Sequence, residues 1–159
     1  MILVMLGTQN NSFHRLLEEI QKNIDTGRIK EEVIVQKGYT KFESKDMTLF
    51  NEISPDKLNK LIEKADLVIT HGGVGSIISS ITRGKKVIAV PRLKEYKEHV
   101  NDHQKDIIES FKELGYIIGI NKVEELETAL KKANTFKPQK YIQNTGNIVK
   151  IIEEFIENN

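Results

Sequence analysis

The stretch that decides the fold is Leu67-Val68-Ile69-Thr70-His71-Gly72-Gly73-Val74-Gly75-Ser76. It begins with a short, continuous apolar run, which is typical of a parallel strand that is covered on both faces. Three glycines within four positions then let the backbone turn tightly and approach a ligand without a Cβ atom in the way. A helix that begins near Val74 would present unpaired N–H groups and the positive end of its dipole, which together favour an anion.

The glycine turn has two interpretations: a phosphate site to which Ser76 adds a hydroxyl, or a strand-to-helix turn that binds nothing. The dinucleotide-binding fingerprint does not match, because the glycines fall at positions 72, 73 and 75 and no acidic residue ends a following strand. The Walker motif does not match either, since Gly-Lys-Ser or Gly-Lys-Thr does not occur.

Strand and helix patterns alternate on both sides of this turn. The expected strands are Ile2–Leu6, Val33–Val35, Met47–Phe50, Val87–Val90 and Tyr116–Ile120. Between them lie helical patterns, with Ser12 and Ser54 as expected N-caps and Pro55 at a first helical position. Strands separated by helices predict a Rossmann-like parallel sheet with helices on both faces. The pattern does not specify the strand order.

Composition sets the class of protein. The 159 residues suit one domain, 1–159, and the net charge of +1 gives no sign of a nucleic-acid partner. The absence of Cys excludes disulfides and thiolate metal sites, and no run reaches the roughly 18 apolar residues of a membrane span. The apolar start, Met1 to Leu6, is too short for a secretory signal. Without carboxylates at metal-ligand spacing, we expect neither a metal nor a cofactor.

Four motifs together resemble the nucleotide-sugar half of glycosyltransferase family 28. They are MLGTQ at 5–9, HGGVGSI at 71–77, VIAVPR at 87–92 and HVNDHQ at 99–104. In length and layout the chain resembles two groups of soluble subunits in this family. One is the bacterial exopolysaccharide transferase subunit. The other is the eukaryotic subunit that, with a membrane partner, adds the second N-acetylglucosamine to a dolichol-linked sugar.

The resemblance implies one half of the two-domain architecture called GT-B, with the other half missing from this chain. It also implies a donor-binding, catalytic subunit that transfers a hexose from a UDP-sugar, by inversion and without metal, to a lipid-linked acceptor in polysaccharide biosynthesis. UDP-galactose, UDP-glucose and UDP-N-acetylglucosamine are the expected donors. The membrane-associated partner would hold this subunit at the cytoplasmic face of the membrane. A third interpretation, a nucleotide-binding domain unrelated to sugars, rests on the glycine turn alone.

The resemblance assigns a phosphate contact to His71 and a contact with the donor sugar to Gln104, whose amide suits paired hydroxyls. Gly7, Thr8 and Gln9 follow the first strand and form either a second phosphate contact or a simple connecting loop. Asn101 and His103 flank Gln104, and Asn101 or Asp102 also suits an N-cap. The expected substrate-binding residues are Gly7, Thr8, His71, Gly72, Gly73, Val74, Gly75, Ser76, Ser79, Arg92, Asn101, His103 and Gln104.

One position departs from the family pattern. Where relatives commonly place an acidic residue that holds the ribose hydroxyls, this chain has Ser79, which lacks a charged, bidentate acceptor. This favours the alternative of a non-catalytic nucleotide-sugar-binding or enhancer subunit. The general base of an inverting transfer is expected with the partner, and His14 and His99 are weak candidates within this chain.

The end of the chain carries an apolar stripe on a helical pattern, formed by Ile148, Ile151, Ile152, Phe155 and Ile156. Two interpretations fit this stripe equally well: it packs on the sheet of its own domain, or it docks on the partner subunit.

Overall fold

The computed structural model describes residues 1–142 and Glu153. The strands are β1 (Ile2–Met5), β2 (Val33–Gln36), β3 (Met47–Phe50), β4 (Leu67–His71), β5 (Lys86–Val90) and β6 (Ile118–Gly119). The α-helices are α1 (His14–Asp25), α2 (Pro55–Lys64), α3 (Val74–Ile81), α4 (His103–Glu113) and α5 (Leu126–Ala133). Two short 3₁₀ helices are η1 (Lys94–Tyr96) and η2 (Val123–Glu125). The expected fold class is confirmed.

All six strands are parallel and lie in the order β3-β2-β1-β4-β5-β6. The two central strands, β1 and β4, pair from Ile2 with Leu67 to Met5 with Thr70. The chain moves outward from β1 in one direction and outward from β4 in the other, so a topological switch point lies between them. In open parallel sheets, ligands bind in the crevice beyond the carboxyl ends of the strands at such a point.

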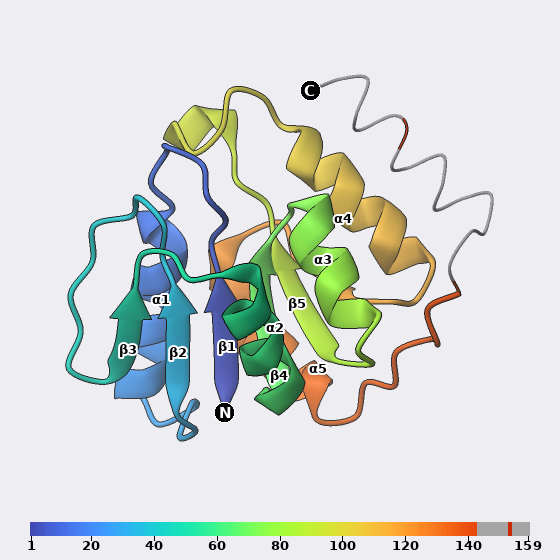
Figure 1. Cartoon of the computed structure of the whole chain (residues 1–159), viewed down its shortest axis with the longest axis horizontal. Helices are drawn as coiled ribbons and strands as arrows, with labels where there is room; N and C mark the ends of the chain where they lie inside the picture. Colours follow the sequence, from blue (N-terminus) through green and yellow to red (C-terminus); the bar gives the residue numbers. More distant parts are fainter. Residues whose placement is uncertain (143–152, 154–159) are drawn as a thin grey trace.

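Helices cover both faces of the sheet. In Figure 1, α2, α3 and α4 lie in front of the sheet, and α1 and α5 lie behind it. Alternate side chains of the strands therefore enter two separate cores, because successive residues of a strand point to opposite faces. In β1, Val4 joins the core with α1 and α5, whereas Leu3 and Met5 join the core with α2, α3 and α4.

Two local predictions were wrong. Ser12 is not the N-cap of α1, because Phe13 occupies that position and, within the described residues, α1 has no side-chain cap. The last strand is shorter than Tyr116–Ile120, since the N–H of Tyr116 donates instead to Phe111 O and closes the end of α4. The N-cap at Ser54 is confirmed, with its hydroxyl accepting from Lys57 N at 3.3 Å.

The apolar stripe from Ile148 to Ile156 lies outside the described residues. Among the residues that the structure describes, no helix combines the length and apolar character needed to cross a bilayer.

Candidate functional site

A cavity of about 460 Å³ lies at the switch point, beyond the carboxyl ends of β1 and β4, and we call it the carboxyl-end pocket. Seven of the thirteen expected substrate-binding residues line it: Gly7, Thr8, His71, Gly73, Val74, Gly75 and Ser76. Five further residues complete the lining: Gln9, Gln36, Glu52, Ile53 and Leu58. The fold thus brings the first-strand loop and the glycine turn, more than 60 positions apart in the sequence, to one pocket.

The glycine turn leads directly into α3, whose first-turn N–H groups have no acceptor one helical turn earlier. Gly75 is exposed, and a Cβ atom built on it would meet no described atom within 4 Å outside its chain neighbours and the backbone of its own helix. The helix start therefore faces open space at the pocket. This arrangement suits an anion that approaches the backbone closely.

The other two glycines of the turn serve a different purpose. A Cβ atom on Gly73 would lie 2.4 Å from His71 Cε1, and one on Gly72 would lie 2.7 Å from Gln104 Cβ. The backbone of Gly7, with φ +82°, packs closely against the same imidazole, because a Cβ atom there would lie 2.6 Å from His71 Nε2. These glycines make room for neighbouring side chains of the protein.

His71 is 6% exposed and ends β4. Its Nε2 atom lies 3.3 Å from Ser76 Oγ, and its Nδ1 atom lies 3.1 Å from Gln104 Nε2. Burial, followed by the positive charge of Arg92, lowers the pKa of His71 to about 3. The imidazole is therefore neutral at physiological pH and lines the pocket as an uncharged hydrogen-bonding group.

Gln36 was not anticipated from the sequence. It is 4% exposed, and its amide donates to Gly7 O at 2.9 Å and to Asn51 O at 3.2 Å. Its oxygen accepts from Gly7 N at 3.1 Å. The side chain thus fixes the position of the loop that follows β1 beside the pocket. A polar residue directly after the apolar run Val33-Ile34-Val35, at a carboxyl strand end, was the available signal.

The loop between β3 and α2, together with the start of α2, supplies the rest of the unanticipated lining. Ile53 and Leu58 are partly exposed and offer apolar surface, whereas Glu52 is exposed and offers a carboxylate. Nothing in the local sequence pattern marks these residues, because their position depends on β3 pairing with β2 at the edge of the sheet.

Six expected residues do not line this pocket: Gly72, Ser79, Arg92, Asn101, His103 and Gln104. The predicted sugar contact of Gln104 disagrees with its placement, since Gln104 is 1% exposed. Its oxygen already accepts from Gly72 N at 2.9 Å and from Arg92 N at 3.1 Å. Asn101 likewise has a structural partner, because its side-chain oxygen accepts from His103 N at 3.0 Å at the start of α4.

The side chain of Arg92 connects the segments that follow β1 and β5. Its guanidinium is 1% exposed and donates to Leu6 O, to Asn11 O at 2.8 Å and to Glu98 O at 3.1 Å. Burial lowers its pKa to about 10, which leaves it positively charged at neutral pH. The donors of Arg92 are committed to main-chain carbonyls of two segments, the one after β1 and the one after β5, so this geometry does not favour the expected substrate contact.

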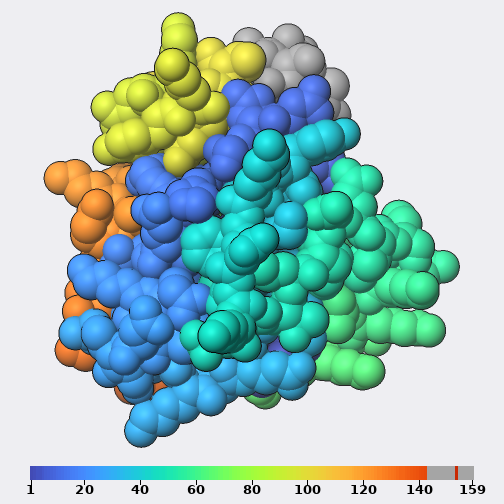
Figure 2. All heavy atoms as spheres, turned by 90° about the vertical axis from the view of Figure 1, so that its left-hand side faces the viewer, coloured from blue at the N-terminus to red at the C-terminus, as the bar shows by residue number. Residues whose placement is uncertain are grey.

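These loops meet at one end of the molecule. Gln9 lies 2.8 Å from His99 Nε2, and Asn11 Nδ2 donates to Lys97 O at 3.0 Å. In Figure 2, the yellow loop around residues 93–100 projects at the top beside the blue loop around residues 8–12. The residues after β1 and after β5 therefore form one continuous rim at the carboxyl end of the sheet.

Neither candidate base has a ring nitrogen free of contacts with the described residues. His14 Nε2 lies 2.7 Å from Glu18 Oε1 and its Nδ1 lies 3.1 Å from Lys41 O. His99 Nδ1 accepts from Asn101 N at 3.3 Å, while the Gln9 amide contacts its Nε2. Burial, with a further contribution from Arg92, lowers the pKa of His99. Neither histidine lines the carboxyl-end pocket.

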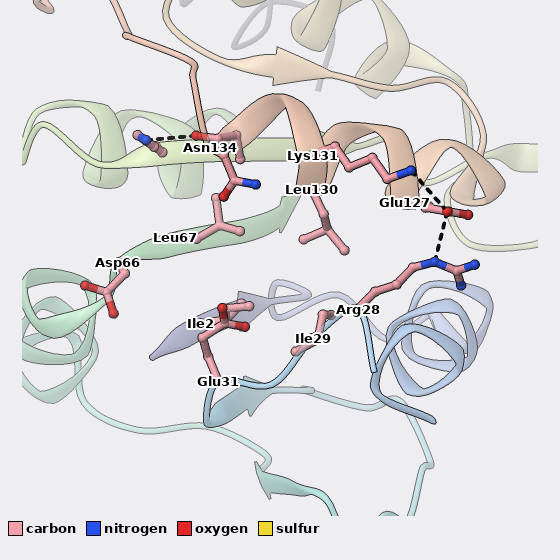
Figure 3. Close-up of a pocket in the computed structure, with 12 residues that line it drawn as sticks. Ile2, Arg28, Ile29, Glu31, Asp66, Leu67, Glu127, Leu130, Lys131 and Asn134 are labelled. Carbon is pink, nitrogen blue, oxygen red and sulfur yellow. Dashed lines mark hydrogen bonds and ion pairs between the residues drawn. The ribbon is translucent and has the colours of Figure 1, made fainter. Parts of the chain in front are cut away.

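A second cavity of about 420 Å³ lies at the opposite end of the sheet, beside the first residues of β1, β4 and β5. Figure 3 shows Arg28, Glu127 and Lys131 along one side, with Glu127 forming ion pairs with Arg28 at 2.9 Å and with Lys131 at 3.6 Å. Lys86 at its edge donates to Ala133 O at 2.8 Å. Because these cations are already paired, and the amino ends of parallel strands rarely bind ligands, the carboxyl-end pocket is the better candidate.

Curated relatives share part of this sequence. The UDP-N-acetylglucosamine transferase subunit ALG13 of Candida albicans is 29% identical over 104 residues, which is 65% of this chain and 34% of the relative. The protein of the same description from Candida glabrata is 30% identical over 106 residues, 65% of this chain and 50% of the relative. The matches thus span between a third and a half of these relatives.

Solved structures share the fold. An NMR structure of ALG13 superposes with a TM-score of 0.61 at 19% identity, covering 95% of this chain and 93% of that one. MurG of Acinetobacter baumannii superposes with a TM-score of 0.55 at 17% identity, covering 83% of this chain and 40% of MurG. The fold therefore corresponds to one half of a GT-B glycosyltransferase, as the sequence resemblance implied.

The sequence pattern of the whole domain gives the assignment. Residues 1–158 match the glycosyltransferase family 28 C-terminal domain. The match covers nearly the full chain and includes both the glycine turn and the loop that ends at Gln104. This chain belongs to the family of glycosyltransferase family 28 C-terminal domains.

Proposed function

We propose that this chain is the donor-binding subunit of a two-component transferase. It binds UDP-N-acetylglucosamine and, with a membrane-associated partner subunit, transfers the sugar to a lipid-linked acceptor. The observation that carries the proposal is the carboxyl-end pocket, where His71 and the open start of α3 meet at the switch point. The relatives described as N-acetylglucosamine transferase subunits favour this sugar over glucose and galactose, and they give no support to exopolysaccharide assembly.

The lining of the pocket suggests how the nucleotide lies. The diphosphate faces Gly75, Ser76 and the N–H groups of the first turn of α3, where the helix dipole favours negative charge. The uracil ring packs against the apolar surface of Ile53 and Leu58, on the side of the pocket nearest to β3.

In this proposal Glu52 is the acidic residue that holds the ribose hydroxyls, a role for which Ser79 lacks a carboxylate. Glu52 lines the pocket on the same loop as Ile53, and its side chain carries the charged, bidentate acceptor that suits two ribose hydroxyls. Ser79 lies outside the pocket lining, and its carbonyl oxygen accepts from Arg83 Nη1 at 2.8 Å. A serine at position 79 therefore does not argue against nucleotide binding.

The general base is assigned to the partner subunit. An inverting transfer requires a base near the acceptor hydroxyl, and both histidines considered for this role are engaged by other groups away from the pocket. The same observation favours a second candidate function, a nucleotide-sugar-binding subunit that assists another transferase. Both candidates place the chain at the cytoplasmic side of the membrane through its partner.

Calorimetry with UDP and UDP-N-acetylglucosamine tests the donor site. Both should bind the unmodified chain. Glu52→Gln should weaken binding about tenfold, because a charge-assisted acceptor is lost, while the matched variant Ser79→Ala should leave affinity unchanged. Absence of UDP binding by a folded chain contradicts the proposal, and a loss at Ser79 without one at Glu52 contradicts the placement of the ribose.

Co-purification with the partner, followed by a transfer assay with a lipid-linked acceptor, separates the two candidates. Transfer that depends on this chain and falls with Glu52→Gln supports the donor-binding subunit. Transfer that continues with a chain unable to bind UDP supports the assisting subunit.

A further inference from the structure

The orientation of the Gln104 amide is fixed by two main-chain donors. Gln104 lies in the first turn of α4 and is 1% exposed. One of its amide atoms lies 2.9 Å from Gly72 N and 3.1 Å from Arg92 N. Both of these are backbone N–H groups, which only donate, so the atom that faces them is the carbonyl oxygen. The NH₂ group must then point the other way.

The NH₂ group points at His71. The distance from Gln104 Nε2 to His71 Nδ1 is 3.1 Å. Because an amide NH₂ only donates, Nδ1 must be the acceptor and carries no proton. A neutral imidazole in this position has its proton on Nε2. The two backbone N–H groups thus determine, through Gln104, which nitrogen of His71 is protonated.

A half-turn of the His71 ring would place Cδ2 instead of Nδ1 opposite the Gln104 NH₂ group, so the contact with Gln104 fixes the orientation of the ring. A Cβ atom on Gly7 would lie 2.6 Å from Nε2, and one on Gly73 would lie 2.4 Å from Cε1, so both backbones pack closely against the imidazole. Nε2 lies 3.3 Å from the hydroxyl oxygen of Ser76, and both residues line the pocket. At this point His71 therefore presents an N–H donor to the pocket.

We propose that Gln104 is a positioning residue, which holds His71 as the Nε2–H tautomer so that a neutral imidazole donates into the phosphate end of the carboxyl-end pocket. The nature of the ligand rests on the proposed function, whereas the tautomer does not. The opposite tautomer would present a lone pair to a phosphate oxygen and repel it.

Nitrogen NMR of the histidine side chains in the ligand-free protein tests the tautomer directly. Wild type should give a pyrrole-type shift for Nε2 and a pyridine-type shift for Nδ1 of His71. In Gln104→Glu, a carboxylate can still accept from Gly72 N and Arg92 N but can no longer donate, so a proton should appear on Nδ1. A wild-type Nδ1–H tautomer, or an unchanged tautomer in the folded variant, overturns the proposal. If the variant does not fold, the wild-type spectrum alone shows which nitrogen of His71 carries the proton and so tests the proposal.

UDP binding completes the test. Gln104→Glu should weaken UDP affinity at least tenfold, but part of that loss comes from the added negative charge. The same substitution in a His71→Gln background measures the charge effect alone, since glutamine has no tautomer to set. A loss of equal size in both backgrounds overturns the positioning role. If the wild-type tautomer is as expected but UDP does not bind, the proposed function fails while the assignment of Gln104 to the tautomer stands.

Discussion

His71 is the residue on which the site converges. The backbones of Gly7 and Gly73 pack against its ring, and Gln104 contacts its Nδ1 atom. The sequence motif shows these residues as separate features, a glycine turn and a distant glutamine. In three dimensions Gly72 and Gly73 make room for protein side chains, and Gly75 is the glycine of the turn with open space beside it.

Substitution of these glycines by alanine separates the two purposes. In Gly73→Ala, the new Cβ atom would overlap the imidazole, so we expect a loss of about 1 to 3 kcal/mol in the free energy of unfolding and at least tenfold weaker UDP binding. Gly75→Ala is the matched control for stability, because its Cβ atom meets no described atom. Urea denaturation and calorimetry measure both effects. A fully stable Gly73→Ala variant would mean that the ring is not packed as described.

Burial of a neutral His71 also predicts a pH dependence of stability. The imidazole has a pKa near 6.5 in the unfolded chain and about 3 in the folded one, so below pH 6.5 the unfolded state binds a proton that the folded state does not. The free energy of unfolding should therefore fall as pH decreases from 6.5 towards 3, by up to about 1.4 kcal/mol per pH unit from this residue. Above pH 6.5 the imidazole is neutral in both the folded and the unfolded state, so His71 causes no loss of stability there.

His71→Gln isolates this contribution from the other titrating groups. Urea denaturation at pH 7, 6, 5 and 4 should give a shallower decline for the variant than for wild type. Equal slopes would show that His71 titrates in the folded protein much as it does in the unfolded chain.

At the scale of elements, helix starts differ in how they are held. The N-terminus of α2 is fixed by its own sequence, with Ser54 as cap and Pro55 in the first turn, and this places Leu58 at the pocket. The start of α1 is fixed by tertiary contacts, because the N–H of Phe13 donates to Thr40 Oγ1 at 2.9 Å and the Phe13 ring is fully buried. A serine before a helix is therefore not sufficient evidence of a cap.

Two serine substitutions test this difference. Ser54→Ala should lower the free energy of unfolding by about 1 kcal/mol, because the N–H of Lys57 loses its acceptor. Ser12→Ala should change it by less than about 0.5 kcal/mol, since Ser12 is exposed and precedes the cap position. Thermal or urea denaturation of both variants measures the pair. A larger loss at Ser12 than at Ser54 would reverse the assignment.

At the scale of the whole molecule, the strand order creates the site. Since β1 and β4 are neighbours, the helices that follow them lie on opposite faces of the sheet, and the two connecting loops part above the switch point. The carboxyl-end pocket lies between these loops. Arg92 then ties the rim together by binding carbonyl groups from the segments after β1 and after β5.

The sequence by itself determined the alternation of strands and helices, the glycine turn and seven residues of the pocket. It could do so because these features are local: apolar runs, Pro55 after Ser54, and glycines within four positions. It also carried the motifs that identify the family, which the match over residues 1–158 confirms.

Only the tertiary structure decided the strand order, the lining contributed by Gln36 and Glu52, and the placement of Arg92 and Gln104. The direction in which a polar side chain points depends on which distant segments surround it. Arg92 and Gln104 are polar residues in a loop and at a helix start, where exposure to a ligand is the usual expectation. They are buried here because unpaired main-chain groups at the ends of β1 and β4 require partners, and these two side chains supply them.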